Sequence, residues 1–91
     1  MSVSVRIPTI LRTYTGGAAE VSAEGETLRD VLQKLEADFP GIGARILDGT
    51  GKIRRFVNVY VGDEDVRFAD NLDTATPAGV QVSIIPAVAG G

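Results

Sequence analysis

The sequence predicts a single α+β domain in which one main helix packs against one face of a mixed sheet of four or five strands. One segment has the apolar spacing of an amphipathic helix, and several short segments alternate apolar and polar residues. These segments follow one another as β-β-α-β-β-β, and the 91 residues of the chain suffice for one domain, residues 1–91. Because one helix cannot cover both faces of such a sheet, we expect the other face to remain open.

Two strands are predicted before the helix. Residues 2–7 alternate apolar and polar side chains, which is the pattern of a half-buried strand. Residues 19–23 form the second strand, with Val21 as its inward-facing residue. The Gly-Gly pair at residues 16–17 lies between these segments and favours a hairpin, because glycine adopts positive φ at low cost.

The helix is predicted over residues 28–39. Thr27 precedes it as an N-cap, and Asp30 lies three residues further on, as in a capping box with the shorter acid. Pro40 ends the helix because proline cannot continue the backbone hydrogen bonding. The apolar residues follow the spacing i, i+3, i+4, i+7 and i+11 and therefore share one face: Leu28, Val31, Leu32, Leu35 and Phe39.

A short helical turn and the third strand are predicted next. The turn is expected within residues 41–52, which glycines interrupt repeatedly. The strand covers residues 56–61. Its valines should face the helix, which places Phe56 and Tyr60 on the open face.

The remaining chain supplies the last two strands. Residues 62–65 read as a turn, residues 66–68 as a short fourth strand, and residues 80–85 as the last strand. If the valines of this strand and Ile84 face the helix, Ile85 lies on the open face. An open-faced α+β roll with this order of elements is the β-grasp, or ubiquitin-like, arrangement.

The composition excludes several classes of function. The chain contains no Cys and no His, which removes thiolate nucleophiles, imidazole bases and the usual zinc ligands. We therefore expect no enzymatic activity, no metal site and no cofactor bound by the chain itself. Nine basic residues against twelve acidic ones argue against a nucleic-acid partner. The strand-like N-terminus and the lack of a long apolar run predict a cytoplasmic protein without a membrane partner.

The C-terminal end carries the strongest functional signal. We expect a flexible tail at about residues 86–91, following directly on the last strand. Two terminal glycines lack Cβ atoms, so an extended backbone can enter a narrow slot in a partner enzyme. The residues predicted to thread into partner active sites are Val88, Ala89 and Gly90. The terminal carboxylate belongs to Gly91 and becomes an acyl donor once it is activated, typically as an acyl-adenylate.

The chain resembles the ThiS/MoaD family of sulfur carriers, prokaryotic relatives of ubiquitin, and in particular the CysO-like branch of actinobacterial cysteine biosynthesis. The terminal motif marks the family, while the opening and middle segments are similar to the CysO-like branch. The similar segments span nearly the whole chain: residues 7–12, 15–17, 55–58, 63–68 and 85–91. One departure lies at residues 76–81, where the family usually has an acidic turn near the partner-facing edge, so partner choice could differ.

The resemblance implies a mechanism. A ubiquitin-activating-type enzyme adenylates Gly91 with ATP, and a sulfur donor converts the acyl-adenylate into a thiocarboxylate. The thiocarboxylate then gives its sulfur to a biosynthetic enzyme. In the CysO-like branch, this acceptor is a PLP-dependent enzyme that holds an activated serine, and a metalloprotease afterwards releases cysteine.

Two other interpretations remain open from the sequence. The chain could be the small subunit of a molybdopterin-synthase-type enzyme, or a β-grasp protein-binding module whose Gly-Gly end is incidental. In the carrier interpretation, exposed apolar residues on the open face are candidates for partner docking. These candidates are Ile85, Phe56 and Tyr60.

Overall fold

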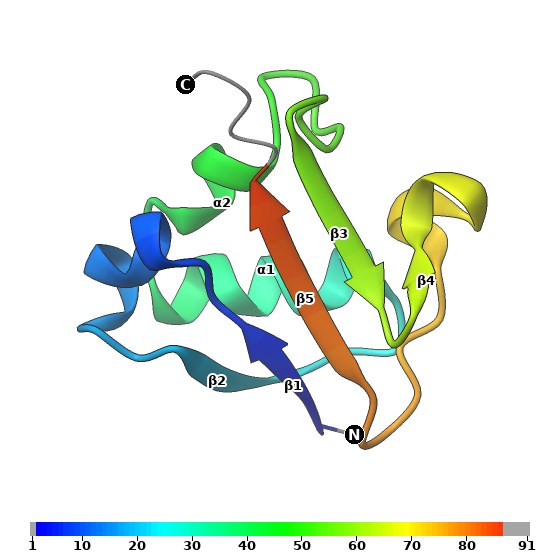
Figure 1. Cartoon of the computed structure of the whole chain (residues 1–91), viewed down its shortest axis with the longest axis horizontal. Helices are drawn as coiled ribbons and strands as arrows, with labels where there is room; N and C mark the ends of the chain where they lie inside the picture. Colours follow the sequence, from blue (N-terminus) through cyan, green and yellow to red (C-terminus); the bar gives the residue numbers. More distant parts are fainter. Residues whose placement is uncertain (1, 87–91) are drawn as a thin grey trace.

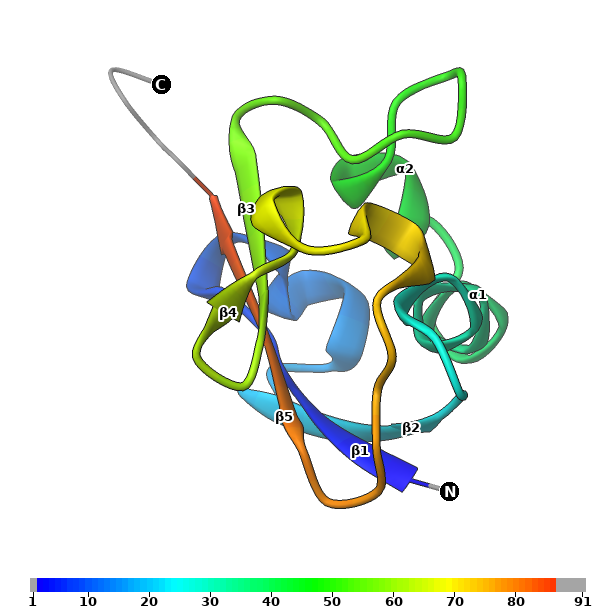
Figure 2. The ribbon, with the colours of Figure 1, turned by 90° about the vertical axis from the view of Figure 1, so that its right-hand side faces the viewer.

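The structure is a computed structural model that describes residues 2–86. It contains one five-stranded sheet with the order β2-β1-β5-β3-β4. The central strand β5 (Gln81–Pro86) pairs in parallel with β1 (Ser2–Arg6) and antiparallel with β3 (Val57–Val61). The helix α1 (Leu28–Asp38) lies across one face of the sheet (Figures 1 and 2). The predicted open-faced β-grasp roll is confirmed.

The first two strands form the predicted antiparallel pair, but their connection differs from a simple hairpin turn. β1 pairs with β2 (Glu20–Glu24) over five residue pairs. Between them, the chain forms a 3₁₀ helix, η1 (Thr9–Thr15), which buries Leu11 and Thr15. The glycine pair follows this helix with positive φ at both positions, as a tight turn requires. On β2, Ala23 is buried and Val21 is half-buried, so the inward residue is Ala23 more than Val21.

The helix α1 forms where its periodicity predicts. The Thr27 hydroxyl accepts a hydrogen bond from the Asp30 backbone N–H at 3.4 Å, which confirms the N-cap. Phe39 is the C-cap residue and packs half-buried against the core. The residues that the helix buries are Leu28, Val31, Leu32 and Leu35. The apolar face of α1 therefore supplies one wall of the core.

The segment after α1 contains the predicted short helix, α2 (Ile42–Ile46). The Glu36 carboxylate joins the two helices by accepting hydrogen bonds from the backbone N–H groups of Gly41 and Gly43, at 2.9 and 2.8 Å. In the loop that follows, hydrogen bonds from the side chain and backbone of Thr50 and the backbone of Lys52 hold the pKa of Asp48 below its usual value. These polar contacts order an exposed corner that has little apolar burial.

The fourth strand was predicted at the wrong residues. β4 consists of Glu64–Asp65, which pair with Val61 and Tyr60, and residues 66–68 form the 3₁₀ helix η2 (Val66–Phe68). The Asp65 carboxylate accepts the Arg67 backbone N–H at 2.9 Å and so caps η2. This cap bends the chain out of the sheet directly after Asp65, and the alternation Val-Arg-Phe does not reveal it.

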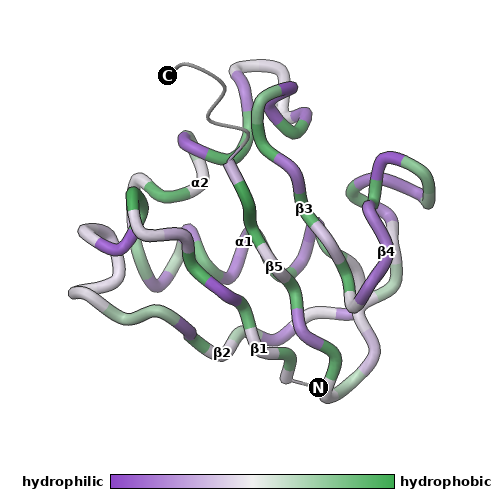
Figure 3. The backbone as a smooth tube through the Cα atoms, in the orientation of Figure 1, coloured by the Kyte–Doolittle hydropathy of each residue, from purple (hydrophilic) through white to green (hydrophobic). Residues whose placement is uncertain are grey.

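The core lies between α1 and the inner face of the sheet. Apolar and polar residues alternate along β1 and β5, as Figure 3 shows. Among the described residues, the outer face has no helix over it, and Figure 2 shows the helices on the other side. The fully buried side chains include one or more residues from most elements: Val5, Ile7, Leu28, Leu35, Ile42, Ile46, Val59, Val66 and Val82.

The departure at residues 76–81 lies at the beginning of β5, the end of the strand opposite to Ile85 (Figure 1). It follows the short 3₁₀ helix η3 (Asn71–Asp73), whose Leu72 packs against the core. Thr76 is 2% exposed, and its hydroxyl donates to the Gly25 carbonyl at 2.9 Å. The loop therefore fastens the β2–α1 junction and lies away from the end of β5 that leads to the tail.

Thr76→Val should lower the free energy of unfolding by about 1–3 kcal/mol, because the partly buried Gly25 carbonyl loses its donor while the side-chain volume is kept. Thr13 is exposed and its hydroxyl makes no hydrogen bond among residues 2–86. The control Thr13→Val should therefore change stability by about 0.5 kcal/mol or less. Urea unfolding of both variants provides the measurement. Equal stabilities would show that the loop does not fasten this junction.

Candidate functional site

The strand β5 delivers the chain to its C-terminal end at one edge of the molecule. Its last residue, Pro86, pairs with Val57 at the beginning of β3. Pro86 is thus part of the sheet, although it was predicted to begin the tail. The predicted sulfur-attachment residue Gly91 and the predicted threading residues Val88, Ala89 and Gly90 lie outside the described residues.

The three predicted docking residues lie around the end of β5. Ile85 is 47% exposed and pairs with Asn58, while Tyr60 is half-buried and pairs with Ser83. Phe56 is 55% exposed but lies in the turn immediately before β3, not within the strand as predicted. Side chains diagonally opposite on one sheet face are neighbours, so Ile85 and Tyr60 lie next to each other on the open face. Phe56 lies outside this pairing, one residue before Val57, the partner of Pro86.

The surroundings of Ile85 on the open face are mainly polar. Toward β1, this face carries Ser4 and Arg6 of β1 and Ser83 of β5 itself. The Gln81 amide donates to the Glu20 carboxylate at 2.8 Å. An exposed apolar group within a polar face, at the point where the chain leaves the sheet, is typical of a docking site. Docking by these residues stays a prediction.

A groove beside the end of β5 was not found from the sequence. It has a volume of about 370 Å³ and is lined by the beginning of η1, the end of β1 and the last residues of β5. Two cations line it, Arg6 and Arg12, and the Arg12 Nε donates to the Ile7 carbonyl at 3.1 Å. No local pattern signals this groove, because its walls come from segments far apart in the sequence that meet only in the tertiary structure.

Two further properties of the described residues concern metal ions and membranes. Residues 2–86 contain no group of three side chains that could together hold a metal ion. No helix in this part of the chain is long and apolar enough to cross a membrane. The features present at this end of β5 are suited to recognition: an exposed apolar side chain at Ile85 and two arginines in the adjoining groove.

Comparison with known sequences gives relatives over the full length. The sequence model of the ThiS family matches residues 5–91. The sulfur carrier protein CysO of Mycobacterium tuberculosis is 56% identical over 93 aligned residues, which cover 100% of both chains. A putative sulfur carrier protein of Archaeoglobus fulgidus is 32% identical, again over 100% of both chains.

Solved structures agree with these relatives. The crystal structure of M. tuberculosis CysO matches with a TM-score of 0.91 and 55% identity, over 94% of this chain and 99% of that one. The crystal structure of the BexX/CysO complex of Amycolatopsis orientalis matches with a TM-score of 0.92 and 48% identity, over 98% and 99% of the two chains. Such homologues are carrier proteins and not enzymes. On the matched sequence model, the full-length identity and the shared fold, this chain belongs to the ThiS family of sulfur carrier proteins.

Proposed function

We propose that this carrier holds sulfur as a thiocarboxylate on Gly91 and acts as a protein substrate of other enzymes. The observation that carries the proposal is that the central strand β5 ends at Pro86, shortly before the Gly-Gly end of the sequence, in a chain that aligns over its full length with a sulfur carrier. A chain without Cys or His suits this division of labour. It supplies an electrophile and a docking surface, and its partners supply the catalysis.

The first step is activation of the chain end. The Gly91 carboxylate attacks the α-phosphate of ATP on a ubiquitin-activating-type enzyme, displaces pyrophosphate and forms an acyl-adenylate. A sulfur donor at the oxidation level of sulfide then attacks the acyl carbon and displaces AMP, which leaves the thiocarboxylate. ATP is bound by the activating enzyme, and the carrier itself needs no cofactor.

The tail residues are proposed to make this chemistry accessible. Val88, Ala89 and Gly90 decrease in size toward the end of the chain, so the backbone can enter a narrow channel as far as its last carbonyl. Reacting atoms must come within about 3–3.5 Å of one another in a productive geometry. Small side chains next to the reacting group allow that approach.

The second step delivers sulfur to a biosynthetic enzyme. We propose cysteine biosynthesis, with an activated serine on a PLP-dependent enzyme as acceptor and a metalloprotease that releases the product and regenerates Gly91. The proposal rests on the similarity to CysO. Because activation uses ATP inside the cell, we place both steps in the cytoplasm.

Docking is assigned to the exposed residues around the end of β5. Ile85 is the last large apolar side chain of β5, with Tyr60 diagonally opposite on the open face and Phe56 in the turn before β3. A partner that binds this site fixes the direction in which the tail enters its active site. The arginines of the neighbouring groove can pair with carboxylates of the partner.

The test is intact-mass analysis. Purified chain is incubated with extract of its native host, ATP and sulfide, and compared with the same mixture after ATP has been removed by apyrase. We expect replacement of one oxygen by sulfur at Gly91, and only with ATP. An unchanged mass under all conditions would contradict the carrier mechanism and favour a binding module with an incidental Gly-Gly end.

A further inference from the structure

Phe68 is the most exposed large apolar residue described, with 86% of its surface accessible. It ends η2, a turn that is well anchored at both sides. Val66 is fully buried, and the Asp65 carboxylate caps the turn by accepting the Arg67 backbone N–H at 2.9 Å. The chain thus holds an aromatic ring in solvent on an ordered support, where it stabilises nothing within the described fold.

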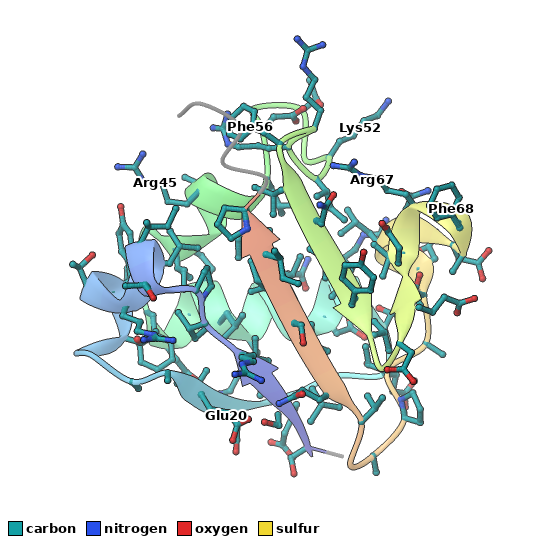
Figure 4. All side chains as sticks on the ribbon, viewed as in Figure 1. Glu20, Arg45, Lys52, Phe56, Arg67 and Phe68 are labelled. Atoms are coloured by element: carbon teal, nitrogen blue, oxygen red, sulfur yellow. The ribbon has the colours of Figure 1, made fainter. Side chains whose placement is uncertain are left out.

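Arg67 connects this turn to the one that carries Phe56. The Arg67 Nη2 lies within hydrogen-bonding distance of three carbonyl oxygens, those of Arg54 at 3.3 Å, Arg55 at 2.7 Å and Val57 at 2.7 Å. Phe56 lies between the second and third of these residues. One guanidinium therefore fixes the backbone that presents Phe56 to the backbone that presents Phe68, and Figure 4 shows both rings along one edge with Arg67 between them.

Cations accompany the two rings. Four of the nine basic residues of the chain fall within residues 52–67, although the net charge of the chain is −3. The side chains of Lys52 and Arg55 are exposed and have no hydrogen-bond or ion-pair partner among residues 2–86. Lys52 and Arg67 also line one hollow of about 500 Å³. Arg29, Asp70 and Asp73 line it too, and Arg29 is ion-paired with Asp73. We name Lys52, Arg55, Phe56, Arg67 and Phe68 the aromatic-basic edge.

We propose that the aromatic-basic edge is a second docking surface, for the protein partner that receives the tail, and that this partner offers an apolar pocket for Phe68 flanked by carboxylates. Two observations support this occupant. The edge is continuous with the end of the sheet from which the tail leaves, because Phe56 immediately precedes Val57, the pairing partner of Pro86. Its unpaired cations on an acidic chain complement an acidic face.

The aromatic-basic edge differs from the Ile85 site in which partner proteins it can distinguish. Ile85 lies next to the tail, so any partner that takes the tail must pass it. Phe68 lies on the far side of β3, beyond β4, and a partner contacts it only if its own surface extends that way (Figure 4). The edge therefore distinguishes among the enzymes that share one tail. This inference rests on the proposed carrier function, since it assumes a partner that takes the chain end.

The test compares Phe68→Ser with Ile10→Ser. Ile10 is 61% exposed on η1, outside the edge, so it controls for loss of an exposed apolar side chain. The first measurement is calorimetric binding to A. orientalis BexX, which forms a complex with a CysO similar to this chain. The second is sulfur loading in host extract, followed by intact mass. We expect Phe68→Ser to weaken BexX binding or slow loading by roughly tenfold or more, and Ile10→Ser to change neither.

The charge is tested by Arg55→Glu against Lys34→Glu, an equal change of charge on the exposed face of α1. We expect only Arg55→Glu to weaken binding, and we expect the difference from the wild type to shrink as the salt concentration is raised. Unchanged binding and loading in Phe68→Ser would overturn the proposal. The proposal would also be overturned if light scattering showed that the wild type is a dimer and that Phe68→Ser dissociates it. The surface would then bind a second copy of this chain. Failure of the carrier mechanism itself is distinct, because the wild type would then show no sulfur uptake.

Discussion

Deletion of Gly91 should abolish thiocarboxylate formation and leave the fold unchanged. The deletion leaves a carboxylate on Gly90, which ends the chain one residue short, a displacement of up to about 3.5 Å in an extended backbone. A misplacement of about 1 Å already costs on the order of 100-fold in rate when reacting groups are held in position. The truncated carboxylate therefore cannot reach the α-phosphate of ATP while the domain remains docked.

Two controls accompany this deletion. A chain extended by one glycine after Gly91 places its carboxylate too far along, and should also fail to load. Both variants should melt at the wild-type temperature, because terminal residues beyond the last strand contribute little to stability. Sulfur uptake is followed by intact mass in host extract with ATP and sulfide. A truncated chain that still takes up sulfur at the wild-type rate would exclude Gly91 as the attachment residue.

Ile84→Ala should mainly lower the stability of the fold, whereas Ile85→Ala should mainly weaken partner binding, although the two residues are adjacent isoleucines. Ile84 is 3% exposed and faces α1, so truncation leaves a cavity and should cost about 2–5 kcal/mol of unfolding free energy. Ile85 is 47% exposed, so its truncation should cost about 1 kcal/mol or less, including the lower strand propensity of alanine. At a docking site, the same change should weaken partner binding by roughly thirtyfold.

The measurement for this pair is urea unfolding together with binding to A. orientalis BexX. Ile84→Ala is expected to retain the binding affinity at temperatures where it is folded. If Ile85→Ala binds like the wild type, the docking assignment of Ile85 is wrong, whatever its stability. A loss of several kcal/mol in Ile85→Ala would instead mean that this side chain is needed by the core.

The sequence was sufficient for the elements whose signal is local. The helix α1 follows from the periodicity of its apolar residues and the Thr27 cap, and both are present in the structure. The alternation along β5 places Ile84 inside and Ile85 outside, as observed. These features depend on apolar residues that recur every 3.6 residues in a helix or every 2 residues in a strand, and this spacing can be read from the sequence.

Two of the wrong assignments, those of residues 66–68 and of Phe56, share one physical cause, a polar contact that redirects the backbone. The Asp65 cap and the Arg67 guanidinium turn residues 66–68 into a 3₁₀ helix, although their alternation matches a strand. η1 forms in the connection between β1 and β2, where the Gly-Gly pair suggested a simple turn. Phe56 lies in the turn held by Arg67 and not in β3.

The site was predictable to a similar extent. Sheet alternation places Ile85 and Tyr60 on the open face, as predicted, whereas Phe56 lies in the turn before β3. Neither the groove with Arg6 and Arg12 nor the aromatic-basic edge could be found in this way. Both combine segments that are distant in sequence, and their side chains meet only after the sheet has assembled.

The parallel pairing of β1 with β5 has a mechanical consequence. The two strands begin at the same edge of the sheet, so a force that pulls on the C-terminal end against the N-terminus slides β5 along β1. The hydrogen bonds between the two strands are then loaded in shear, so they must break together and not one after another. On its other side, β5 pairs with β3 through five residue pairs, which share the load. We therefore expect the domain to resist unfolding when its C-terminal end is pulled against its N-terminus.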